Sequence, residues 1–179
     1  MASTRFRRKR GSVMLNAAEA EAPVLRGLLE QLVELVAPQG PPDDDPLAAM
    51  VGIGTATETP QDPVLARLFP DAYADDAEAA GEFRRYTETG LRETKQDAAL
   101  TALGTLNDPG RDRVLTTAEA QAWLTALNDL RLALGTRLEV DQDWSEQYDR
   151  LPDDDPTRFW LGVYDWLSHL QESLVAALT

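Results

Sequence analysis

Apolar residues recur at intervals of three and four positions along four long stretches of the chain, which is the spacing of one buried helix face. A fifth, shorter stretch begins at Pro63, and proline is well suited to the first helical position because it lacks only an amide that has no partner there. The pattern predicts a mainly α fold, a helical bundle of about four longer helices, with a small β-hairpin or pair of short strands near the N-terminus. The predicted helices span residues 17–36, 63–69, 76–106, 117–138 and 156–178.

Two of these helices begin in the same way, 100 residues apart. A short β-prone run is followed by Asn16 or Thr116, and a glutamate stands three positions later, at Glu19 and Glu119. In such a capping box the first side chain binds the amide of the third helical residue while the glutamate binds the cap amide. Both helices are therefore predicted to start there, and the two short runs are expected to pair as strands. Arg5–Arg10 extends the first run into a hairpin that turns at Gly11.

Segments rich in Pro, Gly and Asp separate the helices and are predicted to be loops, at residues 38–62 and 141–155. The second loop ends at Asp155, a helix cap. The chain is expected to form a single helical domain over residues 1–179, with a basic N-terminal arm at residues 1–12.

Composition excludes several kinds of chemistry. The chain has no cysteine, which excludes disulfides, thiol nucleophiles and thiolate metal sites. The single histidine, His169, has Asp165 four residues before it and Glu172 three residues after it, and is predicted to form a surface pair. The triple aspartates at 43–45 and 153–155 lack the spacing of a calcium loop, and the GIGT segment at 52–55 lacks the lysine of a phosphate loop. No cofactor or metal is expected, and the protein is expected not to be an enzyme.

Charge is distributed very unevenly. The net charge is −14, yet five of the six residues from Arg5 to Arg10 are basic, which leaves about −19 on the rest of the chain. A basic arm on an acidic body can bind nucleic acid, bind an acidic protein or lie on its own body. The overall charge opposes general nucleic-acid binding. The candidate partner contacts in the arm are Arg5, Arg7, Arg8, Lys9 and Arg10.

No apolar run approaches the roughly 20 residues of a membrane span, and no apolar signal-peptide region follows the basic stretch. The sequence therefore predicts a cytoplasmic protein that does not bind membranes. Exposed apolar helix seams are typical of proteins that form homodimers, so a homodimer is a further expectation.

Three polar residues interrupt the otherwise apolar segment WLTALNDLRLALG at 123–135. A helical wheel places Arg131 at the edge of the core face, Asn128 farther round and Asp129 on the opposite side. A guanidinium at that edge must be paired, because arginine does not deprotonate. We therefore predict a structural polar clamp, in which acids from neighbouring helices bind Arg131. Its predicted members are Arg131, Asn128, Asp129, Glu82, Glu88 and Asp165.

The segment EFRRYTE at 82–88 carries further charge. Arg84 and Glu88 lie one helical turn apart, and Phe83 is expected to point to the core. Arg84 and Arg85 are interpreted either as internal ion-pair partners or as a contact surface for another protein.

Several segments resemble an actinobacterial family known as domain of unknown function 2017. The resemblance runs from FRRKRGSVML to the C-terminus through DPVLARLFPDAY, EFRRYTETGLR, AWLTALNDLRLALGTRLEV and YDWLSHLQESLVAAL, and ALNDLRLALG is its most specific part. The resemblance implies an oxidative-stress regulator of transcription that works through a protein partner of the transcription machinery. It also implies a gene beside a Clp-protease adaptor. A disulfide switch cannot be carried over, because this chain has no cysteine.

Four functional hypotheses follow. The first is a non-enzymatic cytoplasmic regulator that binds another protein through the basic arm and the Arg84–Arg85 region. The second is a regulator that binds DNA directly through Arg5–Arg10. The third is an adaptor or scaffold linked to Clp proteolysis. A carboxylate hydrolase is the fourth, and it would need two acids about 5–10 Å apart in a pocket that raises a pKa.

Overall fold

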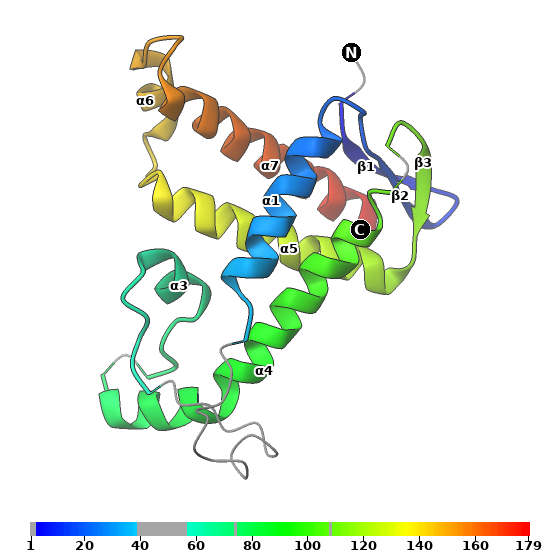
Figure 1. The fold of residues 1–179 in the computed structure, drawn as a ribbon. Coiled ribbons are helices and arrows are strands. Elements are labelled where there is room, and N and C mark those ends of the chain that lie inside the picture. The colour runs from blue at the N-terminus through cyan, green and yellow to red at the C-terminus, as the bar shows by residue number, and fades with distance from the viewer. Residues whose placement is uncertain (1–2, 39–56, 74, 108) are drawn as a thin grey trace.

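The structure is a computed structural model, and it describes residues 3–38, 57–73, 75–107 and 109–179. The described part is mainly helical, with one small antiparallel sheet built around an N-terminal hairpin, as the sequence predicts (Figure 1). No described helix is long and apolar enough to cross a membrane. In sequence order the elements are β1 (Arg5–Lys9), β2 (Ser12–Asn16), α1 (Ala22–Leu35), α3 (Pro63–Leu68), α4 (Ala77–Gly104), β3 (Asp112–Leu115), α5 (Thr117–Arg137), α6 (Trp144–Arg150) and α7 (Pro156–Leu178).

Helix α5 is the central element of the bundle. It contacts α1, α3, α4 and α7, so almost every side of it faces another helix. Trp123 and Leu127 of α5 are fully buried in the core. The predicted apolar seam of α7 is also buried, from Val163 to Ala177, except that Trp160 at its beginning is 38% exposed. The core therefore forms where the periodic apolar positions of separate helices meet.

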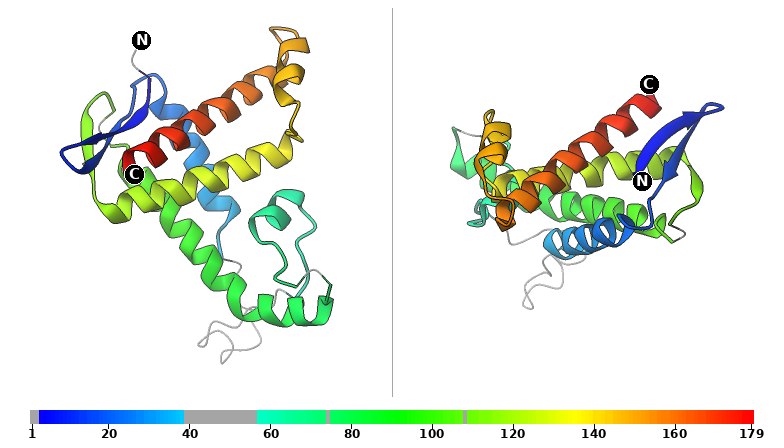
Figure 2. Two further views of the ribbon diagram at one scale, coloured as in Figure 1. Left: turned by 180° about the vertical axis from the view of Figure 1, so that it is seen from behind. Right: turned by 90° about the horizontal axis from the view of Figure 1, so that it is seen from above.

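The sheet has the strand order β1–β2–β3 and lies beside the C-terminal end of α7 (Figure 2). The hairpin turns at Arg10 and Gly11, whose φ angles of 53° and 83° fit the two-residue turn that favours right-handed strand twist. β2 pairs with β3, so the predicted pairing of the two short runs is confirmed. Phe6 lies on the inner face, with its ring centroid 5.4 Å from that of Trp123.

The two predicted capping boxes have different outcomes. Thr116 and Glu119 form the predicted box at the start of α5. The prediction at Asn16 is wrong: β2 includes Asn16, and its side-chain amide donates to Asp112 of β3. α1 begins only at Ala22, without a side-chain cap and with a proline in its first turn. Strand pairing at Asn16 therefore takes the place of the helix start.

The predicted loop at 141–155 contains a short helix, α6, so this prediction is corrected. α6 has no buried residue of its own, and it lies at the end of the bundle away from the sheet (Figure 1). Its Trp144 ring packs edge-on against Tyr164 of α7, at 5.8 Å between centroids. Asp155 caps α7 as predicted, accepting a hydrogen bond from the amide of Thr157. The aspartates at 43–45 and the GIGT segment lie outside the described residues.

Helix α4 is 28 residues long and bent, with its first turns at an angle to the rest (Figure 1). Thr87 and Thr94 each donate a side-chain hydrogen bond to a backbone carbonyl one turn earlier, and such bonds often bend helices. The bend brings the beginning of α4 against the segment at 57–71. Gly81 lies at this approach, where an added Cβ would be 2.6 Å from the carbonyl oxygen of Thr57.

Two glycine substitutions in α4 are expected to have opposite effects. Gly81→Ala would force the two backbones apart and is expected to lower the free energy of unfolding by about 1–3 kcal/mol. Gly90→Ala would meet nothing within 4 Å and is expected to raise it by about 0.5–1 kcal/mol, because alanine favours the helix. Circular dichroism melting curves of both variants test this. A Gly81→Ala variant as stable as the parent would contradict the close approach.

Candidate functional site

A buried ion network occupies the inner side of the bend in α4. Glu88 is 7% exposed and lies between two arginines, one turn before it and one turn after it. Its Oε2 is 2.5 Å from Nη1 of Arg84, and its Oε1 is 2.8 Å from Nη2 of Arg92. Arg84 and Arg92 are only 5% and 3% exposed. One carboxylate therefore binds two guanidinium groups that are shielded from water.

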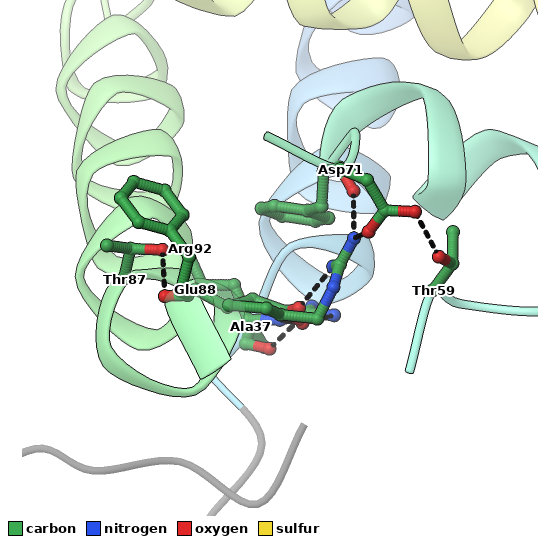
Figure 3. A network of polar contacts seen from close by, with 9 residues as sticks. Ala37, Thr59, Asp71, Thr87, Glu88 and Arg92 are labelled. Atoms are coloured by element: carbon green, nitrogen blue, oxygen red, sulfur yellow. Dashed lines mark hydrogen bonds and ion pairs between the residues drawn. The ribbon is translucent and has the colours of Figure 1, made fainter. Parts of the chain in front are cut away.

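The network also fixes the segment that follows α3. Nη2 of Arg84 donates to the carbonyl of Phe69 and to Oδ1 of Asp71, at 2.9 and 2.7 Å. The guanidinium of Arg92 lies 4.3 Å from the centroid of the Phe69 ring. Figure 3 shows that Asp71 and Glu88 come from different parts of the chain. The hydroxyl of Thr59 donates a hydrogen bond to the other carboxylate oxygen of Asp71. The network thus joins α4 to the segment after α3.

Charge in this network is balanced, with two guanidinium groups and two carboxylates. Burial disfavours the charge on Arg84, but the hydrogen bonds to Asp71 and Glu88 outweigh burial and raise the pKa of Arg84. The same hydrogen bond from Arg84, helped by one from Thr59, lowers the pKa of Asp71. Arg84 and Asp71 therefore stay charged at neutral pH, and every member of the network is bound by its neighbours. The arrangement stabilises the fold and leaves no free acid or base.

These contacts decide between the two interpretations of Arg84. Internal ion pairing is confirmed, and the prediction that Arg84 forms part of a contact surface is wrong, because its side chain is buried. Arg85 is exposed, so its role as a partner contact stays a prediction. Phe83 is 47% exposed rather than in the core, and its ring packs edge-on against Tyr73 at 6.0 Å.

A second buried ion pair joins α4 to α5. Nζ of Lys95 lies 2.6 Å from Oδ1 of Asp129, which is 1% exposed. Burial raises the pKa of Asp129 above its ordinary value, and the hydrogen bond and charge of Lys95 only partly oppose this. The other carboxylate oxygen, Oδ2, has no hydrogen-bond partner. A charge on Asp129 is therefore tolerated only because Lys95 is present.

Arg131 faces the other neighbour of α5, helix α7. Its Nε donates to the hydroxyl of Ser168 at 2.9 Å, and its Nη1 donates to the side-chain oxygen of Gln171 at 2.8 Å. The guanidinium also lies 5.6 Å from the ring centroid of Tyr164. Because Arg131 is only half-buried, water and neutral oxygen atoms are enough to solvate its guanidinium, and no carboxylate is needed to balance the charge.

The predicted polar clamp is therefore wrong in its partners. None of the predicted acids binds Arg131: Glu82 is exposed, Glu88 belongs to the network of Arg84, and Asp165 pairs with His169 at 3.4 Å as predicted for the surface. Asn128 is exposed. Asp129 lies on the side of α5 that faces away from α7, as the helical wheel predicts, and α4 covers that side. The three polar residues act in separate contacts.

The basic arm forms strand β1 and the hairpin turn, as the sequence predicts, and its backbone is bound to the rest of the protein. The amide of Thr4 donates to Glu21, and that of Phe6 donates to Ser173 of α7. The basic side chains nevertheless remain exposed. Arg7 alone among them forms an ion pair with a described residue, at 3.0 Å from Asp112.

The strand register gathers cations on one side of the sheet. Arg5, Arg7 and Lys9 alternate with Phe6 and Arg8 along β1, so they share one side of the sheet. Arg7 lies opposite Met14, which lies opposite Val114. We call five of these residues the outer sheet face: Arg5, Arg7, Lys9, Met14 and Val114. Met14 is only 8% exposed, whereas Val114 is 60% exposed, so Val114 supplies the exposed apolar surface on the same face as the row of cations. Arg8 and Arg10, also exposed, lie towards the hairpin turn.

The hydrolase hypothesis finds no support in the described residues. Asp71 and Glu88 border a cavity of only about 70 Å³ and are bound by Arg84. Asp129, the described acid whose pKa is raised, is buried against Lys95 without access for a substrate. The described part of the chain also contains no group of three metal-binding side chains.

Comparison with known proteins identifies relatives of this chain. It is 36% identical over 177 residues to the oxidative stress regulator AosR of Mycobacterium tuberculosis, and the aligned region covers 90% of this chain and 79% of that protein. It is 38% identical over 148 residues to the putative oxidative stress regulator AosR of Mycobacterium leprae, over 75% of this chain and 67% of that protein. No solved structure matches the chain. A family model described as domain of unknown function (DUF2017) matches residues 3–178, and the chain belongs to this family.

Proposed function

We propose that the protein is a regulator of the oxidative-stress response that acts by binding an acidic surface of a protein of the transcription machinery. Its relatives in Mycobacterium species are named oxidative stress regulators, which supports the regulatory role. The observation that carries the mode of action is the outer sheet face, a row of exposed cations on a chain of net charge −14. Opposite charges on two partners steer their encounter and fix their orientation.

The composition of the outer sheet face favours a protein partner over DNA. Protein interfaces combine an apolar centre with a polar rim, and here Val114, which is 60% exposed, lies on the same face as Arg5, Arg7 and Lys9. Asp112 lies on the same face and neutralises part of the charge of Arg7. DNA would bring a long row of phosphates against the acidic remainder of the molecule, which repels them. Direct DNA binding is therefore the second candidate.

Reversing charge on the outer sheet face is expected to abolish partner binding. Arg5→Glu/Lys9→Glu should reduce recovery of transcription proteins from an actinobacterial lysate about tenfold or more, since it places like charges opposite each other. Quantitative mass spectrometry of proteins that co-purify with the tagged chain measures this.

Arg67→Glu/Arg150→Glu is the matched control, because it changes the net charge equally at exposed positions of α3 and α6 that belong to no predicted contact surface. Equal recovery with both double variants, or no transcription protein with the wild type, would contradict the proposal. Recovery of Clp proteins in their place would favour the adaptor hypothesis. Fluorescence anisotropy with a labelled DNA duplex at low salt tests the second candidate, which requires binding that falls steeply as salt is added.

A further inference from the structure

An apolar groove lies between the C-terminal halves of α1 and α5 and the beginning of α7. In Figure 1 α1 crosses α5 at a steep angle. The groove is lined by residues of both helices and by Trp160 of α7. Eight of its ten lining residues are apolar, and its volume is about 340 Å³. That volume lies within the range of small-molecule sites, about 300–1,000 Å³.

The lining follows from the helical spacing of leucines. Leu28, Leu32 and Leu35 line the groove from α1, and Leu134 of α5 and Leu138 at the C-cap of α5 line it from the other side. Leu28 and Leu32 are buried, whereas Leu35, Leu134 and Leu138 are only half-buried. The half-buried leucines therefore present apolar surface that the described part of the chain does not cover.

Trp160 of α7 completes the lining of the groove. Trp160 is 38% exposed, whereas Leu161, the next residue of the same helix, is fully buried. An exposed indole in an otherwise apolar groove gives a ligand a large flat surface to contact.

Charge at the groove comes from a single cation. Arg137, in the last turn of α5, lines the groove and is exposed. It makes neither an ion pair nor a side-chain hydrogen bond with any described residue, in contrast to Arg84, Arg92 and Arg131. The other polar lining residue is Gln31. None of the described lining residues is a carboxylate, so a ligand with an anionic end has a partner in Arg137 and meets no repulsion from these residues.

We propose that this groove binds a small amphipathic carboxylate, a medium-length apolar chain with one anionic end bound by Arg137. Along α1 the groove extends from Leu28 to Leu35, which is about 10 Å or two helical turns. A stable protein interface needs about 800 Å² per partner, far more than such a groove supplies. The size of the groove thus favours a small ligand. The proposal does not depend on the outer sheet face, which lies on other elements.

Decanoate is a direct probe of this site, and isothermal titration calorimetry measures its binding. We expect one decanoate per chain in the wild type. Arg137→Gln should weaken decanoate binding at least tenfold while leaving the affinity for decanol within about twofold. Ala133→Phe, which fills the groove with a ring, should abolish binding of both compounds. Arg67→Gln, an exposed arginine in the last turn of α3, is the matched control and should change nothing.

Three results would overturn the proposal. The first is no decanoate binding below millimolar concentration. The second is binding that persists in Ala133→Phe, which would indicate non-specific adsorption. The third is an equal loss of affinity for decanoate and decanol in Arg137→Gln, which would show that Arg137 does not bind the anionic end. If decanoate fails to bind and sedimentation velocity detects a dimer that Ala133→Phe dissociates, the groove belongs to a second copy of the chain.

Discussion

Glu88→Gln is expected to lower the free energy of unfolding by about 3–5 kcal/mol, one of the two largest effects among the substitutions described here. The glutamine oxygen can accept from only one of the two arginines, and its amide group then points its hydrogens at the other guanidinium. Two buried positive charges would remain near each other with only Asp71 to balance them. Urea unfolding followed by tryptophan fluorescence at pH 7 measures the loss.

Glu93→Gln is the matched control for this prediction. Glu93 lies on the same helix, is exposed and forms no ion pair with a described residue, so its substitution should change the free energy of unfolding by less than about 0.5 kcal/mol. Equal unfolding midpoints for the two variants would contradict the role given to Glu88. A loss in Glu88→Gln with decanoate binding retained would show that the groove is independent of this network.

Lys95→Met is expected to cost about 3–5 kcal/mol at pH 7, because it leaves the carboxylate of Asp129 buried and unpaired. The double variant Lys95→Met/Asp129→Leu should regain most of that stability, since an apolar pair of similar volume needs no desolvation of charge. Urea unfolding of the single and double variants tests both statements. A double variant as unstable as Lys95→Met would show that the loss comes from packing and not from the unpaired charge.

The cost of Lys95→Met should also depend on pH. The pKa of Asp129 is already raised in the folded protein, so the folded chain binds this proton more tightly than the unfolded chain does. Removing Lys95 raises that pKa further. As the pH falls from 7 to 5, Asp129 of the variant becomes protonated, and its deficit relative to the wild type should shrink. The pKa of Asp71 is lowered, so Asp71 stays charged over this range. A deficit that stays constant or grows on acidification would contradict the assignment.

The fold could be predicted from the sequence wherever a helix carries its own periodic apolar face. The four long helices have such a face. The hairpin turn is likewise specified locally, by the glycine at position 11. Asn16 and Thr116 have the same local pattern but different structures, because Asn16 bonds to Asp112, almost 100 residues away. Helix α6 lacks apolar periodicity and is held by the contact of Trp144 with Tyr164, which no local pattern reveals.

The polar contacts were harder to predict than the helices. Spacing within one helix correctly identified the pair of Arg84 and Glu88. Asp71 and Lys95 were missed, because their partners lie on other elements and depend on how α4 bends and packs. Burial offered one usable indication: an aspartate inside an apolar helix, such as Asp129, requires a cation from a neighbouring helix. The side of the helix on which that neighbour lies is decided by the tertiary structure.

The position of β1 makes the outer sheet face depend on most of the chain. Its hydrogen bond from Phe6 to Ser173 spans 167 residues, and β3, the third strand of the sheet, enters about 100 residues after β2. Contacts between such distant residues form late in folding, because closing a long loop costs chain entropy before any contact repays it. Val114 therefore joins the outer sheet face only once β3 has paired with β2, and a partly unfolded chain would not present the complete face to a partner.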